Sequence, residues 1–216
     1  MTQTLSLLVG ALVAETQPVL SRMTNTKKLG RSLYVGYLSG ARVAVYTCGV
    51  GPIKAEHGTK ATLGLIEKHG FKVGQVVSFG TCGSLVEELS IGDLVCARSL
   101  ATGKSGGDQI DAIDGLRAVN VVTVDRAVTT SAEREELANN GFQVCEMEAA
   151  GVFRAAAGRP FGVIKVVSDT AGGDPEDEVI AKGPRPVRIA RFMIRARLLS
   201  EAHLVGALSE LVSGVL

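Results

Sequence analysis

Glycine punctuates this chain: short apolar runs end at glycine turns, and stretches with helical character separate the runs. The runs that we expect to be strands are LSLLVGALVA, LYVGYL, RVAVYTCG, QVVSFG, GDLVCARSL, VNVVTV and FGVIKVVSD. Strands that alternate with helices indicate an α/β domain, and strands that are apolar on both sides fit a sheet covered on both faces. The pattern therefore predicts a three-layer α/β/α fold around a central mixed, mostly parallel, twisted sheet.

The stretches with helical character are residues 53–69, a segment that opens at Ser131, residues 148–157 and residues 186–212. In the first of them Ile53, Ala61 and Leu65 fall on one i, i+4 stripe, which we expect to face the core. His57 lies on this stripe and is predicted to be packed rather than catalytic. Ser131 precedes acidic residues, so it is the expected N-cap of its helix.

Length and composition limit the class of protein. A chain of 216 residues is long enough for one sizeable core and short for two, so residues 1–216 are predicted to form a single domain. The formal net charge is +1, aromatic residues make up 4% of the chain and tryptophan is missing. These values argue against a nucleic-acid binder, which needs basic patches or aromatic stacking platforms.

The cysteines and the N-terminus point to a protein of the cytoplasm. The four cysteines, Cys48, Cys82, Cys96 and Cys145, are widely spaced and form no zinc-type pair, so we expect neither a metal nor a cofactor. Cys82 is predicted to be packed in a tight turn rather than to act as a nucleophile. The opening MTQTLSLLVGALVAETQ lacks a positive start, and its apolar part is too short to span a membrane, so it is expected to form a buried first strand.

Three glycine-containing turns follow apolar runs directly. They are TCGVGP (residues 47–52), GTCGSL (residues 80–85) and SDTAGG (residues 168–173). Because ligands of open α/β sheets bind beyond the carboxyl ends of the strands, these turns are predicted to line one crevice. The polar, glycine-rich residues 101–115 are the expected mobile loop.

Acidic residues occupy two of these places. The apolar run Phe161–Val167 ends in Ser168-Asp169, and Glu146-Met147-Glu148 stands about twenty residues upstream. Asp169 is either the N-cap of a turn or a site residue, and Glu148 is either a first-turn helix acid or a site residue. Glu146 and the acidic residues 173–178 are expected to face solvent.

Three segments, in order, resemble the nucleoside phosphorylase/nucleosidase superfamily, which cleaves purine ribosides. The first is VGALVAETQPVL, with a glutamate after the first strand. The second runs from CGVGPIKAEHGTKA to VVSFGTCGSLVEELSIGDLVCA, and the third from CEMEAAGVF to PFGVIKVVSDTA. The segment from VNVVTV to CEMEA is most similar to hopanoid-associated and futalosine-type nucleosidases, and residues 97–121 are shorter than in methylthioadenosine/S-adenosylhomocysteine nucleosidases.

The resemblance agrees with what the chemistry requires. Cleavage of a purine N-glycosidic bond needs an acid for the leaving base, an anchor for the ribose hydroxyls and a polarised nucleophile. Asp169 is the candidate acid, which needs a raised pKa. Glu148 is the candidate ribose anchor, with Met147 against the sugar, and Glu15 is the candidate that orients water unless it is a surface residue. The further candidate substrate-binding residues are Val50, Thr81, Gly83 and Ser168.

The nucleophile is predicted to be water. Phosphorylases of the family hold phosphate with arginines, but the first loop here, GALVAETQP, has none, and Ser78 stands where a second arginine would fall. A dianionic phosphate without a guanidinium partner is poorly held. We therefore expect an adenine nucleosidase; a phosphate-dependent phosphorylase and a non-catalytic nucleoside-binding protein are the alternatives.

The resemblance also implies a small-molecule purine nucleoside as ligand and a homodimer. It leaves the 5′ substituent of the substrate open. In the last helix Arg188, Arg191 and Arg195 fall on one face. Such a face is usually solvated, but a basic amphipathic helix also suits peripheral contact with an anionic membrane surface.

Overall fold

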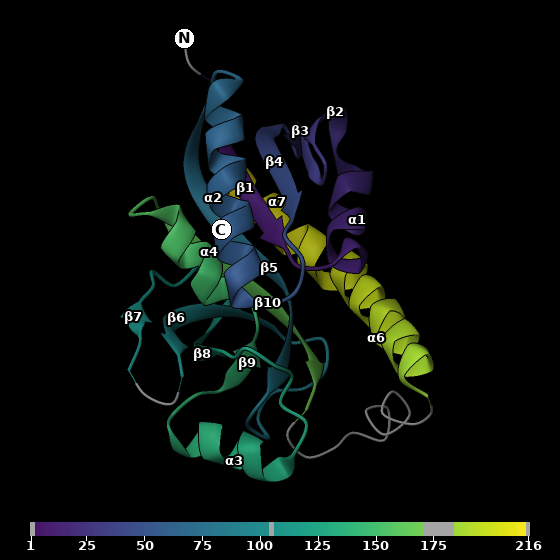
Figure 1. Ribbon diagram of the computed structural model, residues 1–216, viewed down its shortest axis with the longest axis vertical. Helices are drawn as coiled ribbons and strands as arrows, with labels where there is room; N and C mark the ends of the chain where they lie inside the picture. The colour runs from purple at the N-terminus through teal and green to yellow at the C-terminus, as the bar shows by residue number, and fades with distance from the viewer. Residues whose placement is uncertain (1–2, 104–105, 171–183, 215–216) are drawn as a thin grey trace.

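The computed structural model describes residues 3–103, 106–170 and 184–214, and it shows a mixed α/β fold (Figure 1). The strands are β1 (Gln3–Gly10), β2 (Thr24–Gly30), β3 (Leu33–Leu38), β4 (Ala41–Thr47), β5 (Phe71–Ser84), β6 (Leu94–Thr102), β7 (Asp108–Gln109), β8 (Arg117–Thr123), β9 (Val144–Glu146) and β10 (Phe161–Asp169). The helices are α1 (Val13–Arg22), α2 (Pro52–Lys68), α3 (Ser131–Asn139), α4 (Ala149–Ala156), α6 (Arg185–Leu199) and α7 (Val205–Ser213), with a π-helical turn η1 (Ser200–Leu204) between the last two.

The strands form one sheet that partly closes on itself. Its order is β10-β6-β8-β9-β5-β1-β4-β3-β2, β7 pairs with β6, and β10 pairs with β5 as well. The strands β10, β6, β8, β9 and β5 therefore make a closed ring, to which β1, β4, β3 and β2 are added as an open sheet. The long strand β5 belongs to both parts, so it joins the ring to the open sheet.

The sheet is mixed, as predicted, and parallel and antiparallel pairings occur both in the ring and in the open part. β1 pairs in parallel with β4 and β5, but β3 pairs antiparallel with β4, and β10 with β6. The turn between β3 and β4 explains one of these reversals: Ser39 and Gly40 both have positive φ, as a two-residue hairpin turn requires. The chain thus doubles back between β3 and β4.

Helices cover both faces of the open sheet. The predicted three-layer arrangement therefore applies to this part of the fold. Neighbouring residues of β1 point to opposite faces, as the period of a strand requires. Leu7 packs in a cluster with Leu63 and Ile66 of α2, whereas Leu8 packs in a cluster with Val19 of α1 and Leu208 of α7. In Figure 1, α2 and α4 lie in front of the sheet and α7 lies behind it. The ring, however, is not part of a simple three-layer arrangement.

The predicted buried stripe of α2 is wrong. Ile53 is 69% exposed, and His57 and Ala61 are exposed too. Successive i, i+4 steps drift by about 40° around a helix of 3.6 residues per turn, so a stripe of such steps winds off the core face. The residues that α2 buries are Ala55, Thr59, Thr62, Leu63 and Ile66.

Three other expectations have clear outcomes. Thr130, not Ser131, caps α3, because its side chain accepts a hydrogen bond from the Glu133 N–H. The last helical stretch is confirmed as one continuous run through η1. Part of the expected mobile loop is paired and packed, since β7 pairs with β6 and Ile110 is buried. The acidic residues 173–178 lie outside the described residues.

In the ranges that the structure describes, no helix has the length and apolarity needed to cross a membrane.

A glycine sets the closest approach of α2 and α4. A Cβ on Gly151 would lie 2.1 Å from the Pro52 carbonyl oxygen, so Gly151→Ala must push the helices apart. We expect a loss of about 1–3 kcal/mol in the free energy of unfolding, measured by urea denaturation. Gly64→Ala in α2 is the matched control: its Cβ meets no atom within 4 Å, so it is expected to stabilise the helix by up to about 1 kcal/mol. Equal effects of the two substitutions would contradict this packing argument.

Candidate active site

A cavity of about 160 Å³ lies where several strands end. Its walls come from the segments that follow β1, β4, β8 and β9 and from the ends of β5 and β10. All the residues that the sequence singles out line it: Glu15, Val50, Thr81, Gly83, Met147, Glu148, Ser168 and Asp169. The structure therefore brings the eight candidates together at one cavity.

Glu15 is buried, so the interpretation of this glutamate as a surface residue is wrong. It lies in the first turn of α1, and its Oε2 accepts hydrogen bonds from the N–H groups of Ala11 (3.1 Å) and Leu12 (3.0 Å). Its Oε1 accepts from the N–H (2.8 Å) and the hydroxyl (2.9 Å) of Thr81. The carboxylate thus ties the turn after β1 to β5. A Cβ on Gly80 would lie 2.7 Å from Glu15 Oε1, so only glycine leaves room for it.

Asp169 is the last residue of β10 and is held from two sides. Its Oδ1 lies 2.9 Å from the Ser168 hydroxyl, and its Oδ2 forms an ion pair with Arg134 of α3 at 2.5 Å. A Cβ on Gly83 would lie 2.8 Å from Oδ2, so this glycine also makes room for a carboxylate. Gly80 and Gly83, which lie within β5 and not in the turn expected from the sequence, therefore each lie against one of the candidate catalytic acids.

Glu148 occupies the N-cap position of α4 and is buried. Its Oε1 accepts a hydrogen bond from the Gly51 N–H at 2.9 Å, which connects it to the turn after β4. Burial raises the pKa of the Glu148 carboxyl to about 7, and the nearby charge of Glu146 adds to this effect. Lys165 and the Gly51 N–H lower the pKa but do not offset the burial.

Glu146 does not face solvent, so this prediction is wrong. It is buried, and its Oε2 lies 2.9 Å from the ammonium Nζ of Lys165, whose side chain is only 2% exposed. Oε2 also accepts from the N–H groups of Glu148 (3.0 Å) and Ala149 (2.8 Å), and Oε1 accepts from the Thr123 hydroxyl. Glu146 therefore holds the turn that presents Met147 and Glu148 to the cavity.

Lys165 is a buried charged residue near the cavity that we did not predict from the sequence. Burial lowers the pKa of its ammonium, but the carboxylates of Glu146, Glu148 and Glu15 outweigh this effect and raise the pKa above the usual value. A lysine within the apolar run of β10 was itself a signal, because a fully buried lysine needs a paired carboxylate.

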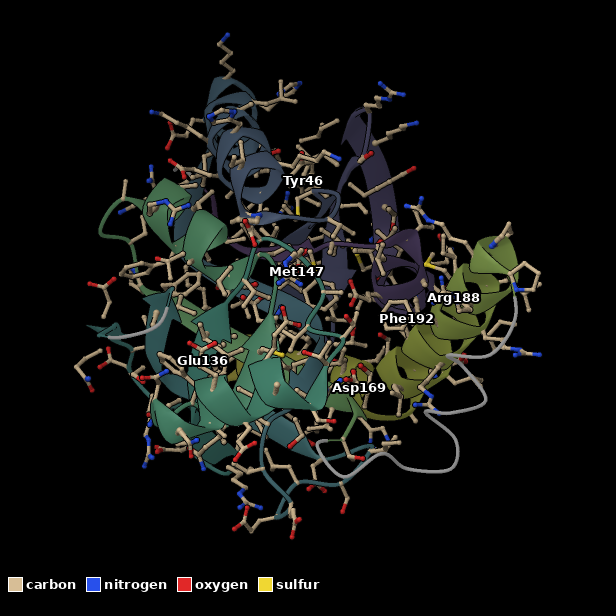
Figure 2. All side chains as sticks on the ribbon, turned by 60° about the horizontal axis from the view of Figure 1, so that its bottom comes forward. Tyr46, Glu136, Met147, Asp169, Arg188 and Phe192 are labelled. Atoms are coloured by element: carbon tan, nitrogen blue, oxygen red, sulfur yellow. The ribbon has the colours of Figure 1, made fainter. Side chains whose placement is uncertain are left out.

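The remaining walls are mostly apolar and were not predicted. Val124, Ala127 and Val128 follow β8, and Phe192 comes from α6. Figure 2 shows Phe192 on the side of α6 nearer to Met147 and Asp169, while Arg188 lies further along the helix. Such walls suit a flat, largely apolar ligand.

The cysteines of the cavity are packed rather than reactive. Burial raises the pKa of the Cys82 thiol well above its usual value, and burial raises that of Cys145 to about 12. Neither thiol is therefore a thiolate near neutral pH, as nucleophilic attack requires. Within residues 3–103, 106–170 and 184–214, no group of three or more His, Cys, Asp and Glu residues is placed to hold a metal ion.

Residues 7–116 match the family model described as the phosphorylase superfamily. The chain belongs to this superfamily. Among curated members, the 5′-methylthioadenosine/S-adenosylhomocysteine nucleosidase of Shewanella sp. (strain MR-7) is 27% identical over 206 residues, which cover 77% of this chain and 84% of that protein. That of Shewanella denitrificans is 24% identical over 241 residues, covering 94% of this chain and 98% of that protein.

Solved structures of the superfamily share the fold. The 5′-methylthioadenosine/S-adenosylhomocysteine nucleosidase from Neisseria meningitidis, in complex with methylthio-immucillin-A, superposes with a TM-score of 0.72 at 22% identity, covering 96% of this chain and 99% of that one. Futalosine hydrolase of Helicobacter pylori gives a TM-score of 0.73 at 20% identity, covering 97% and 99%.

Replacement of Lys165 tests the buried ion pair. Lys165→Met leaves the Glu146 carboxylate buried without its counter-charge, so we expect a loss of about 3–5 kcal/mol in the free energy of unfolding. The double variant Lys165→Met/Glu146→Gln removes both charges and is expected to recover part of the loss. Urea denaturation of the wild type and of both variants measures the difference; a double variant less stable than the single would contradict the pairing.

Glu148 predicts a specific dependence of stability on pH. Its folded pKa of about 7 lies above the ordinary value of 4.5, so between these values the folded state holds a proton that the unfolded state releases. The contribution of Glu148 to stability is therefore fully present below about pH 4.5 and is lost as the pH rises to about 7. Glu148→Gln is expected to gain about 2–3 kcal/mol relative to wild type between pH 5 and pH 8. Urea denaturation at both pH values measures this gain; the same difference at both would contradict a raised pKa.

Proposed function

We propose that this member of the phosphorylase superfamily hydrolyses the N-glycosidic bond of a 5′-substituted adenosine. One observation carries the proposal: Glu15, Glu148 and Asp169 converge on a cavity whose lining, in the part of the chain that the structure describes, includes no lysine or arginine. The names of its curated relatives, 5′-methylthioadenosine/S-adenosylhomocysteine nucleosidases, support the same activity.

Asp169 is the acid in this proposal. It gives a proton to a ring nitrogen of the purine while the electron pair of the C1′–N9 bond moves onto the base. The apolar residues Val124, Ala127 and Val128 form a wall against which the flat base fits, and they limit the access of water to it.

Glu148 is the anchor of the ribose. A buried carboxylate with few donors gains most from a ligand that brings two hydroxyl groups, and the diol of a ribose does so. Because the pKa of Glu148 is about 7, nucleoside binding is expected to strengthen as the pH rises through this value and the carboxylate forms. Met147, beside it on the same turn, packs against the sugar.

Glu15 and Thr81 orient the attacking water. Protein donors occupy the Glu15 carboxylate, but one of them, the Thr81 hydroxyl, is able to rotate away and leave Oε1 for a water molecule. A phosphate dianion at this place would meet a carboxylate and, among the described residues that line the cavity, no guanidinium, which favours water. The buried hydroxyl of Ser78, at the position where a phosphorylase arginine is expected, has no hydrogen-bond partner in the described structure.

Release of adenine from 5′-methylthioadenosine tests the proposal. We expect release in phosphate-free buffer, no acceleration by added phosphate, and methylthioribose as the product. Asp169→Asn is expected to lower kcat by at least about 100-fold with little change in nucleoside affinity, and Glu148→Gln to weaken binding. Strict dependence on phosphate, with a sugar 1-phosphate as product, would show a phosphorylase instead. Nucleoside binding without any turnover would show a binding protein.

A further inference from the structure

Arg134 of α3 connects Asp169, the candidate acid, to the end of β5 and to the segment just beyond β10. Its Nη1 donates hydrogen bonds to the carbonyl oxygens of Ser84 (2.9 Å), at the end of β5, and Thr170 (3.2 Å), just beyond β10. Its Nη2 forms the ion pair with Asp169 Oδ2. The Arg134 side chain is only 18% exposed, so the guanidinium is held in one place by carbonyls on either side of the acid.

Among the described residues, the Asp169 carboxyl has few other constraints on its direction. It stands at the end of a strand, where the pairing of β10 with β5 shifts register between Val167 and Asp169. Its side chain is 32% exposed, and the neighbouring residue on β5 is Gly83, which has no side chain to pack against it. Its orientation therefore depends on its polar contacts.

The contact between Ser168 and Asp169 is compatible with both the protonated and the ionised form of the Asp169 carboxyl. The Ser168 hydroxyl lies 2.9 Å from Asp169 Oδ1 and 3.1 Å from the Cys82 carbonyl oxygen. A hydroxyl has one proton, so it donates to one of these acceptors at a time. When it turns to Cys82, Oδ1 is free to carry a proton. Oδ2 has no such freedom, because a guanidinium keeps its protons.

We propose that Arg134 is a positioning residue for proton transfer: by holding Oδ2 it makes Oδ1 of Asp169 the oxygen that delivers the proton to the leaving purine. The proton moves from Oδ1 to a ring nitrogen of the base as the glycosidic electron pair moves to the base. The carboxylate that remains stays paired with Arg134. Water adds to C1′ and loses one proton to solvent, and Asp169 takes up one proton from solvent before the next turnover, so the protons balance. The inference rests on the proposed hydrolysis.

A pair of substrates with the same sugar separates this role from a structural one. Methylthioadenosine needs an acid for its leaving group, whereas the 4-nitrophenyl glycoside of 5-methylthioribose has a leaving group that departs without protonation. Arg134→Gln is expected to lower kcat for methylthioadenosine by about 10- to 100-fold, with KM changed less than about threefold. For the nitrophenyl glycoside, kcat is expected to change less than about threefold.

Two further variants complete the test. Arg134→Lys keeps a charge near Asp169 but not the fork, whose Nη1 binds both carbonyls while Nη2 binds the carboxylate, so it is expected to recover part of the loss on methylthioadenosine. It gives the same readout if Arg134→Gln does not fold. Arg126→Gln is the matched control, because Arg126 forms an ion pair with Glu133, which lies on α3 as Arg134 does. This substitution is expected to leave both rates unchanged.

The outcomes are distinct. An equal loss on both substrates would show that Arg134 only supports the fold, and an unchanged or increased rate on methylthioadenosine would show that the ion pair does not serve the transfer. Either result overturns the inference while the wild type still cleaves both substrates. A wild type that cleaves neither overturns the proposed function and this inference with it.

Discussion

The ion pair between Lys165 and Glu146 is the interaction on which the cavity depends. It crosses from β10 to β9 in the interior, where an unpaired charge of either sign is strongly destabilising. Glu146 also accepts hydrogen bonds from the backbone of Glu148 and Ala149, so the same carboxylate holds the start of α4. The pair therefore fixes the turn from which Glu148 enters the cavity. Its charges also act on Glu148 in opposite directions: Glu146 raises the pKa of Glu148, and Lys165 lowers it.

Two glycines of β5 leave room for two carboxylates. Gly80 and Gly83 lie so close to Glu15 and Asp169 that a Cβ at either position would collide with a carboxylate oxygen. The two acids thus approach the strand itself, at glycines three positions apart in β5. In the function that we propose, Asp169 serves the base, Glu15 serves the nucleophile and Glu148 serves the sugar, and all three line the same cavity.

Much of the cavity could be predicted from the sequence, because polar residues that follow buried strands gather at one edge of a sheet. Residues whose positions depend on long-range partners could not. Arg134 stands on an exposed-looking helix, and only the fold brings it to Asp169. Glu146 was predicted to face solvent because it was expected to point away from the face of Glu148. Its partner, Lys165, lies in a largely apolar run of another strand, and only the fold brings the two together. The ring of strands could not be predicted for a similar reason: the pairing of β10 with both β5 and β6 has no local signal in the sequence.

The most direct measurement is a crystal structure of the Asp169→Asn variant with methylthioadenosine bound. The account predicts that both ribose hydroxyls lie within hydrogen-bonding distance of the Glu148 carboxylate. It also predicts that a purine ring nitrogen faces the substituted side chain, and that a water molecule lies between Glu15 and C1′. A nucleoside bound elsewhere, or bound in this cavity with its ribose turned away from Glu148, would contradict it.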